Sequence, residues 1–283
     1  MKSKKCVVPE SYQGRRLDQT LELLMPGIGL RGRKRIWEKH RVEVNGRPRE
    51  KGFRVSRGQE ISLVAAKDLP GSGFELEDWP DVRIVKETAG YAALYKPAGL
   101  HTAILESRFE ASLEQGLEVL LANREARLLN RLDRLTSGLV LAGLRPEAAK
   151  RYLQLQGRGK VLKYYLAVCR GRLDKETEVG QRILSTDRKA VRVLAEKDPD
   201  PLRRTLITPL ATDRSRELTL VRVRIFKGAR HQIRAHLAWL GFPLTGDPLY
   251  GQGADANFRL HHHRIEFPGF MAEVEPDWNT DPT

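Results

Sequence analysis

An abrupt change of charge and composition at residues 67–81 constrains the fold of this chain more than any other feature. The stretch holds five acidic residues, one lysine, two prolines and two glycines, which gives a net charge of −4. Residues 1–66 carry 16 Lys+Arg against 7 Asp+Glu, a net charge of +9. Proline and glycine interrupt regular structure. We therefore predict a linker at 67–81 between a small basic domain, 1–66, and a larger domain, 82–270.

Bulk properties bound the class of protein. A chain of 283 residues can form one large and one small domain. No apolar run approaches the roughly 18–20 residues that span a bilayer, and the N-terminus lacks the apolar stretch of a signal peptide. Cys6 and Cys169 lie far apart and have no metal-ligand spacing. We expect a monomeric, cytoplasmic protein that does not bind membranes, with an acidic peripheral tail at 271–283.

The overall charge indicates the kind of partner. The net charge is +14 at pH 7 and the isoelectric point is about 10.0. Such an excess of cations favours a polyanion, of which nucleic acid is the commonest. A simpler explanation of the positive charge is that it keeps the protein soluble. The distribution of the charges along the chain is therefore needed to choose between solubility and nucleic-acid binding.

The small domain has a mixed α/β pattern. Leucines at helical spacing predict a helix over 16–25, and a second short helix is predicted over 31–40. Residues 42–48 are typical of a strand followed by an Asn-Gly turn, and 58–63 of a turn and a closing strand. These elements predict a compact α/β module.

Basic residues concentrate on the second predicted helix of this module. The positive charges of such a cluster repel one another in isolation. Binding to the phosphates of a nucleic acid is favourable, because it releases the counterions that surround those phosphates. A solvated helix face is the alternative. The candidate RNA contacts are Arg31, Arg33, Lys34, Arg35 and Lys39.

The larger domain alternates predicted strands and helices. Residues 218–226 alternate apolar and polar side chains and predict a half-buried strand. The overall pattern predicts an α+β fold with a mixed or antiparallel sheet, and Trp37, Trp239 and the leucine stripes are expected in the cores. The other predicted strands are 82–86, 91–95, 139–144 and 162–168, and the predicted helices are 110–121, 146–156 and 229–240.

Polar clusters interrupt these apolar elements at four places. An isolated Asp such as Asp133, flanked by arginines, would more often be a salt-bridge or turn residue than a catalytic one. The four clusters are Tyr95-Lys96-Pro97-Ala98-Gly99-Leu100, Asn130-Arg131-Leu132-Asp133-Arg134-Leu135-Thr136-Ser137-Gly138, Lys163-Tyr164-Tyr165-Leu166-Ala167-Val168, and Gly228-Ala229-Arg230-His231-Gln232-Ile233-Arg234-Ala235-His236-Leu237 with Gly246-Asp247-Pro248-Leu249-Tyr250-Gly251.

In this order, the four clusters resemble the RluA-type family of pseudouridine synthases, over about residues 82–268. Residues 13–64 resemble the S-four-type RNA-binding module, which often precedes that catalytic domain. The resemblance implies an α+β pseudouridine synthase domain with a small N-terminal α/β RNA-binding module. It further implies an isomerase that acts on RNA without a cofactor, with ribosomal RNA favoured over transfer RNA as its partner.

The resemblance also assigns roles to individual residues. Asp133 matches the catalytic carboxylate, Tyr165 the aromatic residue that packs on the target base and is proposed to take its C5 proton, and Arg234 the arginine that pairs with the Asp. Arg131 matches an arginine that holds the flipped nucleotide. Further RNA contacts are expected from Arg134 and Arg230 in the same clusters. Asn130 stands where the family usually has His, and we expect this difference to affect the position of the loop or of the RNA.

Other functions are weighed against this interpretation. A non-catalytic RNA-binding or ribosome-assembly factor on the same fold, or a synthase acting on transfer RNA, would share much of the sequence. A nuclease or hydrolase would need acidic metal ligands or a nucleophile–base pair, which the sequence does not offer. No metal site is expected at His261-His262-His263, because consecutive side chains of a strand point to opposite faces.

Overall fold

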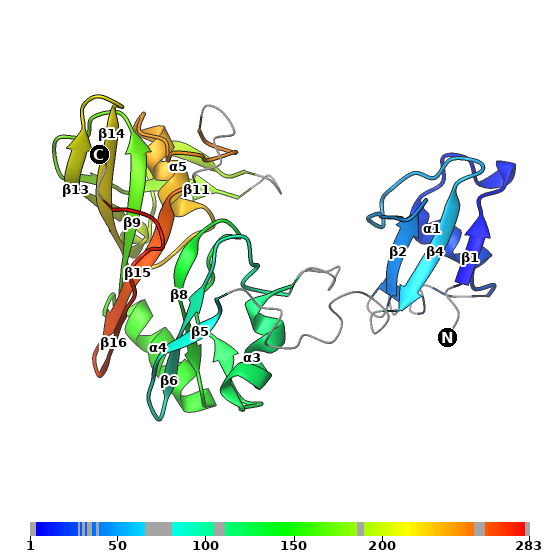
Figure 1. The fold of residues 1–283 in the computed structure, drawn as a ribbon, viewed down its shortest axis with the longest axis horizontal. Coiled ribbons are helices and arrows are strands. Elements are labelled where there is room, and N and C mark those ends of the chain that lie inside the picture. Colours follow the sequence, from blue (N-terminus) through cyan, green and yellow to red (C-terminus); the bar gives the residue numbers. More distant parts are fainter. Residues whose placement is uncertain are drawn as a thin grey trace. The chain divides into compact units, whose positions relative to one another are not determined.

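The chain forms two compact units, Met1–Asp78 with Ile104–Ser112 and Trp79–Ala103 with Leu113–Thr283 (Figure 1). The computed structural model describes residues 4–27, 29, 32, 36–37, 40–65, 81–104, 111–185, 190–251 and 258–280. The five candidate RNA contacts Arg31, Arg33, Lys34, Arg35 and Lys39 lie outside the described residues, as does the predicted linker except Asp81. The two units are described separately.

The N-terminal unit is built on an antiparallel sheet of four strands. Its order is β1 (Lys4–Val7), β4 (Glu60–Ala65), β2 (His40–Val44), β3 (Arg47–Pro48). The predicted Asn45-Gly46 turn connects β2 and β3, with φ values of 51° and 70°. Positive φ at both central residues matches the twist of a tight hairpin.

The helix predicted over 16–25 is shorter and tighter than expected. An α-helical turn, α1 (Leu17–Thr20), continues as a 3₁₀ turn, η2 (Leu21–Leu23), and a further 3₁₀ turn, η1 (Glu10–Tyr12), precedes them. The Thr20 hydroxyl donates to the carbonyl of Leu17 at 2.8 Å, a side-chain bond that competes with the helical ladder. The predicted leucines are nevertheless buried with Trp37 in one core.

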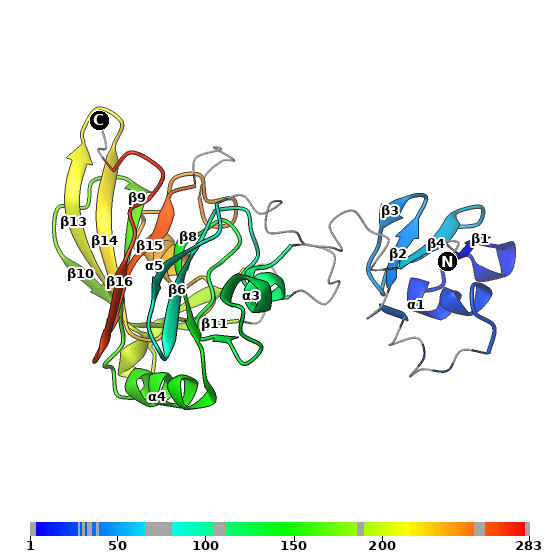
Figure 2. The ribbon, with the colours of Figure 1, turned by 60° about the horizontal axis from the view of Figure 1, so that its bottom comes forward.

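The larger unit contains a ten-stranded mixed sheet, which confirms the predicted α+β class. Its strand order is β10-β13-β14-β9-β15-β8-β6-β5 (Figure 2). In addition, β16 pairs with β15, and β7 pairs with β8. Among the described strands of this sheet, only β8 and β15 pair in parallel. The strands are β5 (Arg83–Glu87), β6 (Tyr91–Lys96), β7 (Arg127–Leu128), β8 (Ser137–Gly143), β9 (Leu162–Arg170), β10 (Thr177–Val179), β13 (Thr205–Asp213), β14 (Leu218–Ile225), β15 (Leu260–Phe267) and β16 (Phe270–Glu273).

Short additional elements flank this sheet. β11 (Gln181–Leu184) and β12 (Arg192–Lys197) form a separate hairpin, and η5 (Pro201–Arg203) precedes β13. The helices are α3 (Leu113–Leu121), α4 (Pro146–Gly157) and α5 (Gln232–Trp239). Within the described part of the chain, no helix is long and apolar enough to cross a membrane.

The structure corrects two details of the sequence analysis. Trp239 is not a core residue: it ends α5 with 44% of its surface exposed, since Ile233 and Leu237 form the buried side of that helix. The acidic C-terminal segment is also less peripheral than its composition predicts. β16 runs to Glu273 and pairs with β15, and the Val274 amide donates to the carbonyl of His263.

Candidate active site

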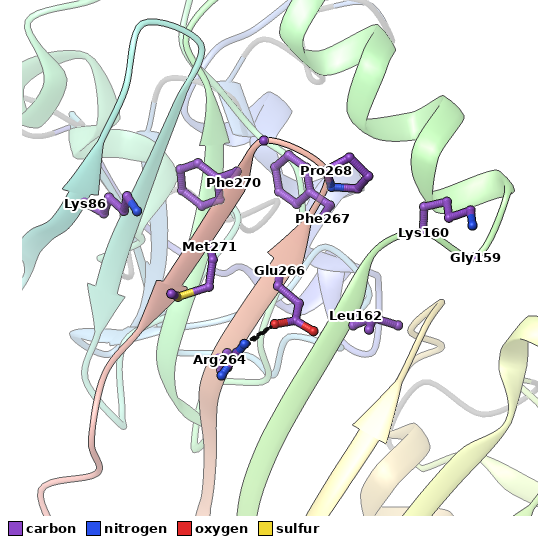
Figure 3. A pocket seen from close by; sticks show the side chains of 11 residues that line it. Lys86, Gly159, Lys160, Leu162, Arg264, Glu266, Phe267, Pro268, Phe270 and Met271 are labelled. Carbon is purple, nitrogen blue, oxygen red and sulfur yellow. Dashed lines mark hydrogen bonds and ion pairs between the residues drawn. The ribbon is translucent and has the colours of Figure 1, made fainter.

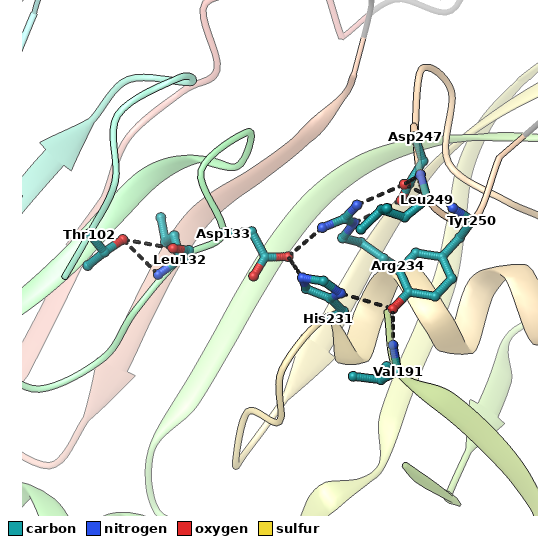
Figure 4. A network of polar contacts seen from close by, with 9 residues as sticks. All are labelled: Thr102, Leu132, Asp133, Val191, His231, Arg234, Asp247, Leu249 and Tyr250. Carbon is teal, nitrogen blue, oxygen red and sulfur yellow. Dashed lines mark hydrogen bonds and ion pairs between the residues drawn. The ribbon is translucent and has the colours of Figure 1, made fainter. Parts of the chain in front are cut away.

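Asp133 lies in the loop between β7 and β8, and its neighbours are fixed by hydrogen bonds. The backbone carbonyl of Asp133 accepts from the Thr136 amide at 3.0 Å. The Thr102 hydroxyl donates to the carbonyl of Leu132 at 2.8 Å and accepts from its amide at 3.1 Å (Figure 4). The Asp133 side chain keeps 27% of its surface exposed. The loop therefore presents a carboxylate that is held in place yet reachable.

A buried lysine ties this loop to the turn after β6. Lys96 is fully buried, and its Nζ donates to the carbonyls of Pro97 and Leu100 at 2.8 Å and of Arg134 at 3.3 Å. Three carbonyl acceptors match the three N–H groups of an ammonium. Burial lowers the pKa of Lys96 to about 7, while the Asp133 carboxylate acts in the opposite direction. Lys96 thus links the two segments that border the carboxylate.

The second residue of the strand after Asp133 is a glycine that no other residue can replace without strain. Gly138 has a φ of 108°, and a Cβ placed there would lie 2.4 Å from the backbone oxygen of His262. This close approach lets β8 pair in parallel with β15. The ring of His262 stacks on Tyr165 with centroids 4.4 Å apart and planes 16° apart. The sheet thereby fixes the Tyr165 ring from behind.

Tyr165 lies on β9 and is almost completely buried, with 6% of its surface exposed. Burial raises the pKa of Tyr165, and the nearby Tyr152 and Asp133 raise it further. The neutral phenol is therefore the favoured form at neutral pH. Among the described residues, the hydroxyl of Tyr165 has no hydrogen-bond partner.

Arg234 on α5 links two carboxylates. Its Nε and Nη2 each donate to Asp247 at 2.8 Å, and its Nη1 donates to Oδ2 of Asp133 at 2.9 Å (Figure 4). Arg234 is 4% exposed and the Asp247 side chain is fully buried. Planar, bidentate pairing of this kind is specific to arginine. Asp247 therefore orients the guanidinium, which in turn holds Asp133.

The pKa shifts of this pair follow from the same contacts. Burial disfavours the charged form of Arg234, but its hydrogen bonds to Asp247 and Asp133 outweigh that effect and raise the pKa of Arg234. Burial also acts to raise the pKa of Asp247, whereas hydrogen bonds from Arg234 and the Leu249 amide hold it below its usual value. Both groups are charged at neutral pH, so the site has a fixed ion pair behind Asp133.

His231 lies beside Asp133 and is itself held by hydrogen bonding to Tyr250. Nε2 of His231 lies 3.8 Å from Oδ2 of Asp133, and its Nδ1 lies 2.9 Å from the hydroxyl of Tyr250. The Val191 amide donates to the same hydroxyl at 2.7 Å. Since an amide only donates, the hydroxyl proton has Nδ1 of His231 as its acceptor among the described residues. In the neutral ring the proton therefore lies on Nε2, facing Asp133.

Burial lowers the pKa of His231, with Arg234 and Arg230 adding to the decrease and Asp133 opposing it. The neutral ring is thus the favoured form at neutral pH. The backbone of His231 has a φ of 53°, which places the residue just before α5 rather than within it. The start of α5 at Gln232, three residues later than predicted, follows from this left-handed conformation.

These contacts distinguish the two oxygens of Asp133. Oδ2 accepts from Arg234 and faces Nε2 of His231. No hydrogen bond to Oδ1 forms within the described ranges of the chain. The described contacts therefore hold one carboxylate oxygen and leave the other without a hydrogen bond.

The remaining predicted site residues occupy varied positions. Arg131 and Arg230 are exposed, whereas Arg134 uses its Nε to donate to the carbonyl of Gly99 at 3.0 Å. Asn130 is bound to β8: its amide nitrogen donates to the Leu139 carbonyl at 3.4 Å, and its oxygen accepts from the Leu141 amide at 2.7 Å. The side chain at position 130 therefore positions the start of the Asp133 loop.

The sequence analysis did not assign a role to four residues of the site. They are Lys96, His231, Asp247 and Tyr250, all of which lie within the polar clusters singled out in the sequence. A charged residue such as Lys96 or Asp247 within apolar surroundings was the available signal. Their side-chain roles could not be inferred, because each has a partner 13 to 38 positions away along the chain.

The three consecutive histidines of β15 face different surroundings. His261 accepts from Ser137 at Nδ1, His262 stacks on Tyr165, and His263 lies 2.7 Å from Glu273. Nε2 of His261 donates to the carbonyl of Val274 at 3.0 Å, which together with the Ser137 contact occupies both ring nitrogens. These positions follow from the alternation of side chains along a strand.

Comparisons with known proteins agree with one another. A family model described as RNA pseudouridylate synthase matches residues 90–239. An uncharacterized RNA pseudouridine synthase of Helicobacter pylori is 32% identical over 227 residues, which cover 78% of this chain and 86% of that protein. The ribosomal large subunit pseudouridine synthase D of Pseudomonas aeruginosa is 32% identical over 257 residues, covering 86% and 76%. In fold, the larger unit is similar to Human RNA Pseudouridylate Synthase Domain Containing 1, with a TM-score of 0.57 at 22% identity, covering 70% of this chain and 84% of that one.

Proposed function

The chain belongs to the RNA pseudouridylate synthase family, and from this premise we propose that Asp133 is the catalytic residue of an enzyme that modifies ribosomal RNA. The enzyme isomerises uridine to pseudouridine in RNA. In that reaction the bond between the ribose C1′ and N1 of uracil breaks, the base rotates, and C5 bonds to C1′. The C5 proton leaves and N1 becomes protonated, so the atoms balance without a donor or an oxidant.

One observation carries the proposal for Asp133: Arg234 holds one oxygen of its partly exposed carboxylate, while the other oxygen accepts no hydrogen bond from the described residues. An ionised carboxylate can either attack the ribose or remove a proton from it, and Oδ1 is the oxygen that would do so. Arg234 stays protonated and donates directly to the other oxygen, so its charge is paired with the carboxylate.

Tyr165 supports a flipped uracil. Taking a base out of its stack costs a few kcal/mol, and stacking on an aromatic side chain returns about 1–3 kcal/mol. The His262 ring behind Tyr165 keeps the phenol in one orientation. The raised pKa of Tyr165 favours the stacking role over that of a base, because a proton acceptor would have to be the phenolate.

Arg234 and His231 act as positioning residues in this proposal. Both address the same oxygen of Asp133, Arg234 by a hydrogen bond and His231 by an N–H group at 3.8 Å. Such alignment by groups that are already oriented avoids reorganisation when the substrate reacts.

Ribosomal RNA is the proposed substrate on the strength of relatives named ribosomal large subunit pseudouridine synthase D, to which the chain is similar over most of its length. We also propose that the N-terminal unit binds RNA, as its resemblance to the S-four-type module suggests. The net charge of +9 over residues 1–66 supports this role. Residues 82–270 would then form the catalytic domain. Transfer RNA is the competing substrate.

The test replaces Asp133 by Asn, which keeps the size of the side chain and removes its charge. We expect pseudouridine formation to fall below detection while RNA binding and thermal stability persist. Comparing pseudouridines in ribosomal and transfer RNA from cells with and without the protein identifies the substrate. Equal activity of the Asn variant and the native protein would refute the role of Asp133. If cells without the protein keep every pseudouridine in both RNAs, a non-catalytic RNA-binding factor becomes the better explanation.

A further inference from the structure

The face of the large sheet opposite Tyr165 has its own set of charged and aromatic side chains. Side chains alternate along β9, so Tyr164 points away from the face that carries Tyr165. Tyr164 pairs across strands with Arg224 of β14 and Arg264 of β15. The side chains on this face therefore form a row that crosses three strands. We call this surface the outer face.

Two hollows reach the outer face. The larger has a volume of about 780 Å³ and lies beside the β15–β16 hairpin (Figure 3); the smaller has a volume of about 140 Å³ and lies over β13 and β14. Both are lined by β9, the larger by Leu162 and the smaller by Tyr164, two residues further along the same strand. The residues used below are Lys86, Lys160 and Arg264 in the larger hollow and Glu176, Arg222 and Arg224 in the smaller.

Most of the cations on this surface have no anionic partner among the described residues. Arg264 is paired, since it contacts Glu266 and Glu273. In contrast, Lys86, Lys160, Arg222 and Arg224 form no ion pair within the described chain. Glu176 is the one carboxylate lining the hollows that no described cation pairs with. The outer face therefore carries an uncompensated positive charge.

Aromatic rings lie among these cations. Arg264 lies over the Tyr164 ring at 5.9 Å, Arg224 over Phe226 at 5.8 Å, and Lys86 over Phe270 at 5.8 Å. The Nε of Arg224 is buried and has no hydrogen-bond partner in the described structure. Phe226 and Phe270 are buried, so these rings support the cations from below, and the unpaired cations are the groups that can follow a nucleic-acid backbone.

We propose that the outer face is a second RNA-binding surface, which holds the phosphodiester backbone of the substrate RNA away from the reacting uridine. The proposal rests on RNA as the enzyme's substrate and is independent of the roles assigned to Asp133, Arg234 and Tyr165. An RNA that engages both faces has to extend beyond the target uridine and pass around the edge of the sheet. Binding at the outer face would therefore favour large, structured RNA over a short stem-loop.

The experiment compares two triple variants of the full-length protein. The test variant replaces Lys86, Lys160 and Arg222 by Gln, and all three side chains are exposed. The control variant replaces three exposed cations that also lack an ion pair in the described chain and do not line either hollow, namely Lys150, Lys175 and Arg214. Both variants lose three positive charges, so any difference in RNA binding between them reflects where the replaced cations lie.

The measurement is the dissociation constant for a fluorescein-labelled RNA hairpin with long single-stranded arms, over a series of salt concentrations. Each phosphate contact to a single strand contributes about 0.7 to the slope of log K against log salt, so we expect the test variant to lose about 2 units of slope. The control variant should keep the native slope, and a hairpin without arms should bind both variants alike. Equal slopes for the two variants with the long RNA would overturn the proposal.

Two further measurements distinguish this proposal from the catalytic assignment of Asp133 and from a protein-binding role of the outer face. The binding assay needs no turnover, so it gives the same answer in the Asp133→Asn background even if the catalytic assignment fails. Labelled polyglutamate tests whether the surface binds acidic protein instead. If polyglutamate binds the native protein but not the test variant, while RNA binding is unchanged in both, the surface is a protein interface and the RNA proposal is wrong.

Discussion

At the residue scale, the site shows how a common residue acquires a specific role. Asp133 between two arginines resembles many surface salt-bridge residues, and its sequence neighbours alone do not distinguish it. In the structure its partner is Arg234, 101 positions later, whose other two nitrogens, Nε and Nη2, are bound by Asp247. Removal of Asp247 would leave the buried guanidinium with Asp133 as its one carboxylate partner in the described structure, and breaking a buried ion pair typically costs about 3–5 kcal/mol.

The hydroxyl of Tyr250 sets the tautomer of His231, and its removal tests the positioning role. Tyr250→Phe leaves Nδ1 of His231 without its donor, so the ring can be protonated on both nitrogens. The charged groups around that ring are Asp133, Asp247, Arg230 and Arg234. We expect kcat to fall roughly tenfold, about 1.4 kcal/mol of transition-state stabilisation, with little change in KM. The acid limb of the kcat profile should move to higher pH, because protonation of His231 becomes easier.

A matched variant provides the control for this prediction. His231→Gln keeps an N–H group that can point at Asp133 but does not titrate, so its acid limb should not shift with Tyr250→Phe. Steady-state kinetics from pH 5 to pH 9, a range that brackets the titration of histidine, measure both variants. An unchanged pH profile in Tyr250→Phe would contradict the assigned tautomer. A lower melting temperature with an unchanged profile would indicate a structural role alone.

At the element scale, the parallel pairing of β8 and β15 depends on one glycine. Gly138→Ala places a Cβ 2.4 Å from the His262 oxygen and also strains a backbone with a φ of 108°. We expect the free energy of unfolding to fall by at least about 2 kcal/mol, with loss of activity because β8 follows directly from the Asp133 loop. Denaturant titration checks this. Gly157→Ala on α4 is the control, since its Cβ meets nothing within 4 Å, and it should be neutral or slightly stabilising.

The same strand pair predicts sensitivity to acid. Burial lowers the pKa of His262 from 6.5 to about 3. Between these values the unfolded chain binds a proton that the folded chain does not, so the free energy of unfolding decreases as the pH falls from 6.5 towards 3. Each pKa unit corresponds to about 1.4 kcal/mol. In denaturant titrations across this pH range, the free energy of unfolding of His262→Phe should decrease less than that of the native protein. An identical decrease in both proteins would refute the lowered pKa of His262.

At the scale of the whole molecule, both proposed RNA-binding surfaces rest on positive charge. The N-terminal basic cluster consists of Arg31, Arg33, Lys34, Arg35 and Lys39. This cluster and the outer face belong to different units, and both carry positive charge. A protein that holds RNA at several places gains affinity mainly through released counterions, and this affinity weakens steeply with salt. We therefore expect changes to these cations to alter RNA binding and not the proposed chemistry at Asp133.

Replacing the five cations Arg31, Arg33, Lys34, Arg35 and Lys39 by Gln tests the N-terminal unit. We expect KM for a long RNA to rise and its salt dependence to weaken by about 3 to 4 units of slope, with kcat nearly unchanged. Steady-state kinetics at several salt concentrations measure both parameters. The control is again the triple variant at Lys150, Lys175 and Arg214. A fall in kcat at unchanged KM would contradict a role of the cluster in binding.

The sequence by itself determined the α+β class and the family. These follow from patterns that are local or that repeat along the chain: alternating strands, turn residues such as Asn45-Gly46, and polar clusters in a fixed order. It also singled out Asp133, Tyr165 and Arg234 as one set through a resemblance. It placed the helix at 16–25 only roughly, because a hydroxyl bond from Thr20 tightens the chain there.

Only the tertiary structure decided which groups act on which atoms. The binding of Arg234 by Asp247, the proton on Nε2 of His231 and the free oxygen of Asp133 each depend on contacts between segments that are distant along the chain. Residue order does not specify the orientation of a guanidinium or an imidazole. That orientation is set by burial, which favours a hydrogen-bond partner for most polar groups, and by the strand pairings that bring those partners within reach.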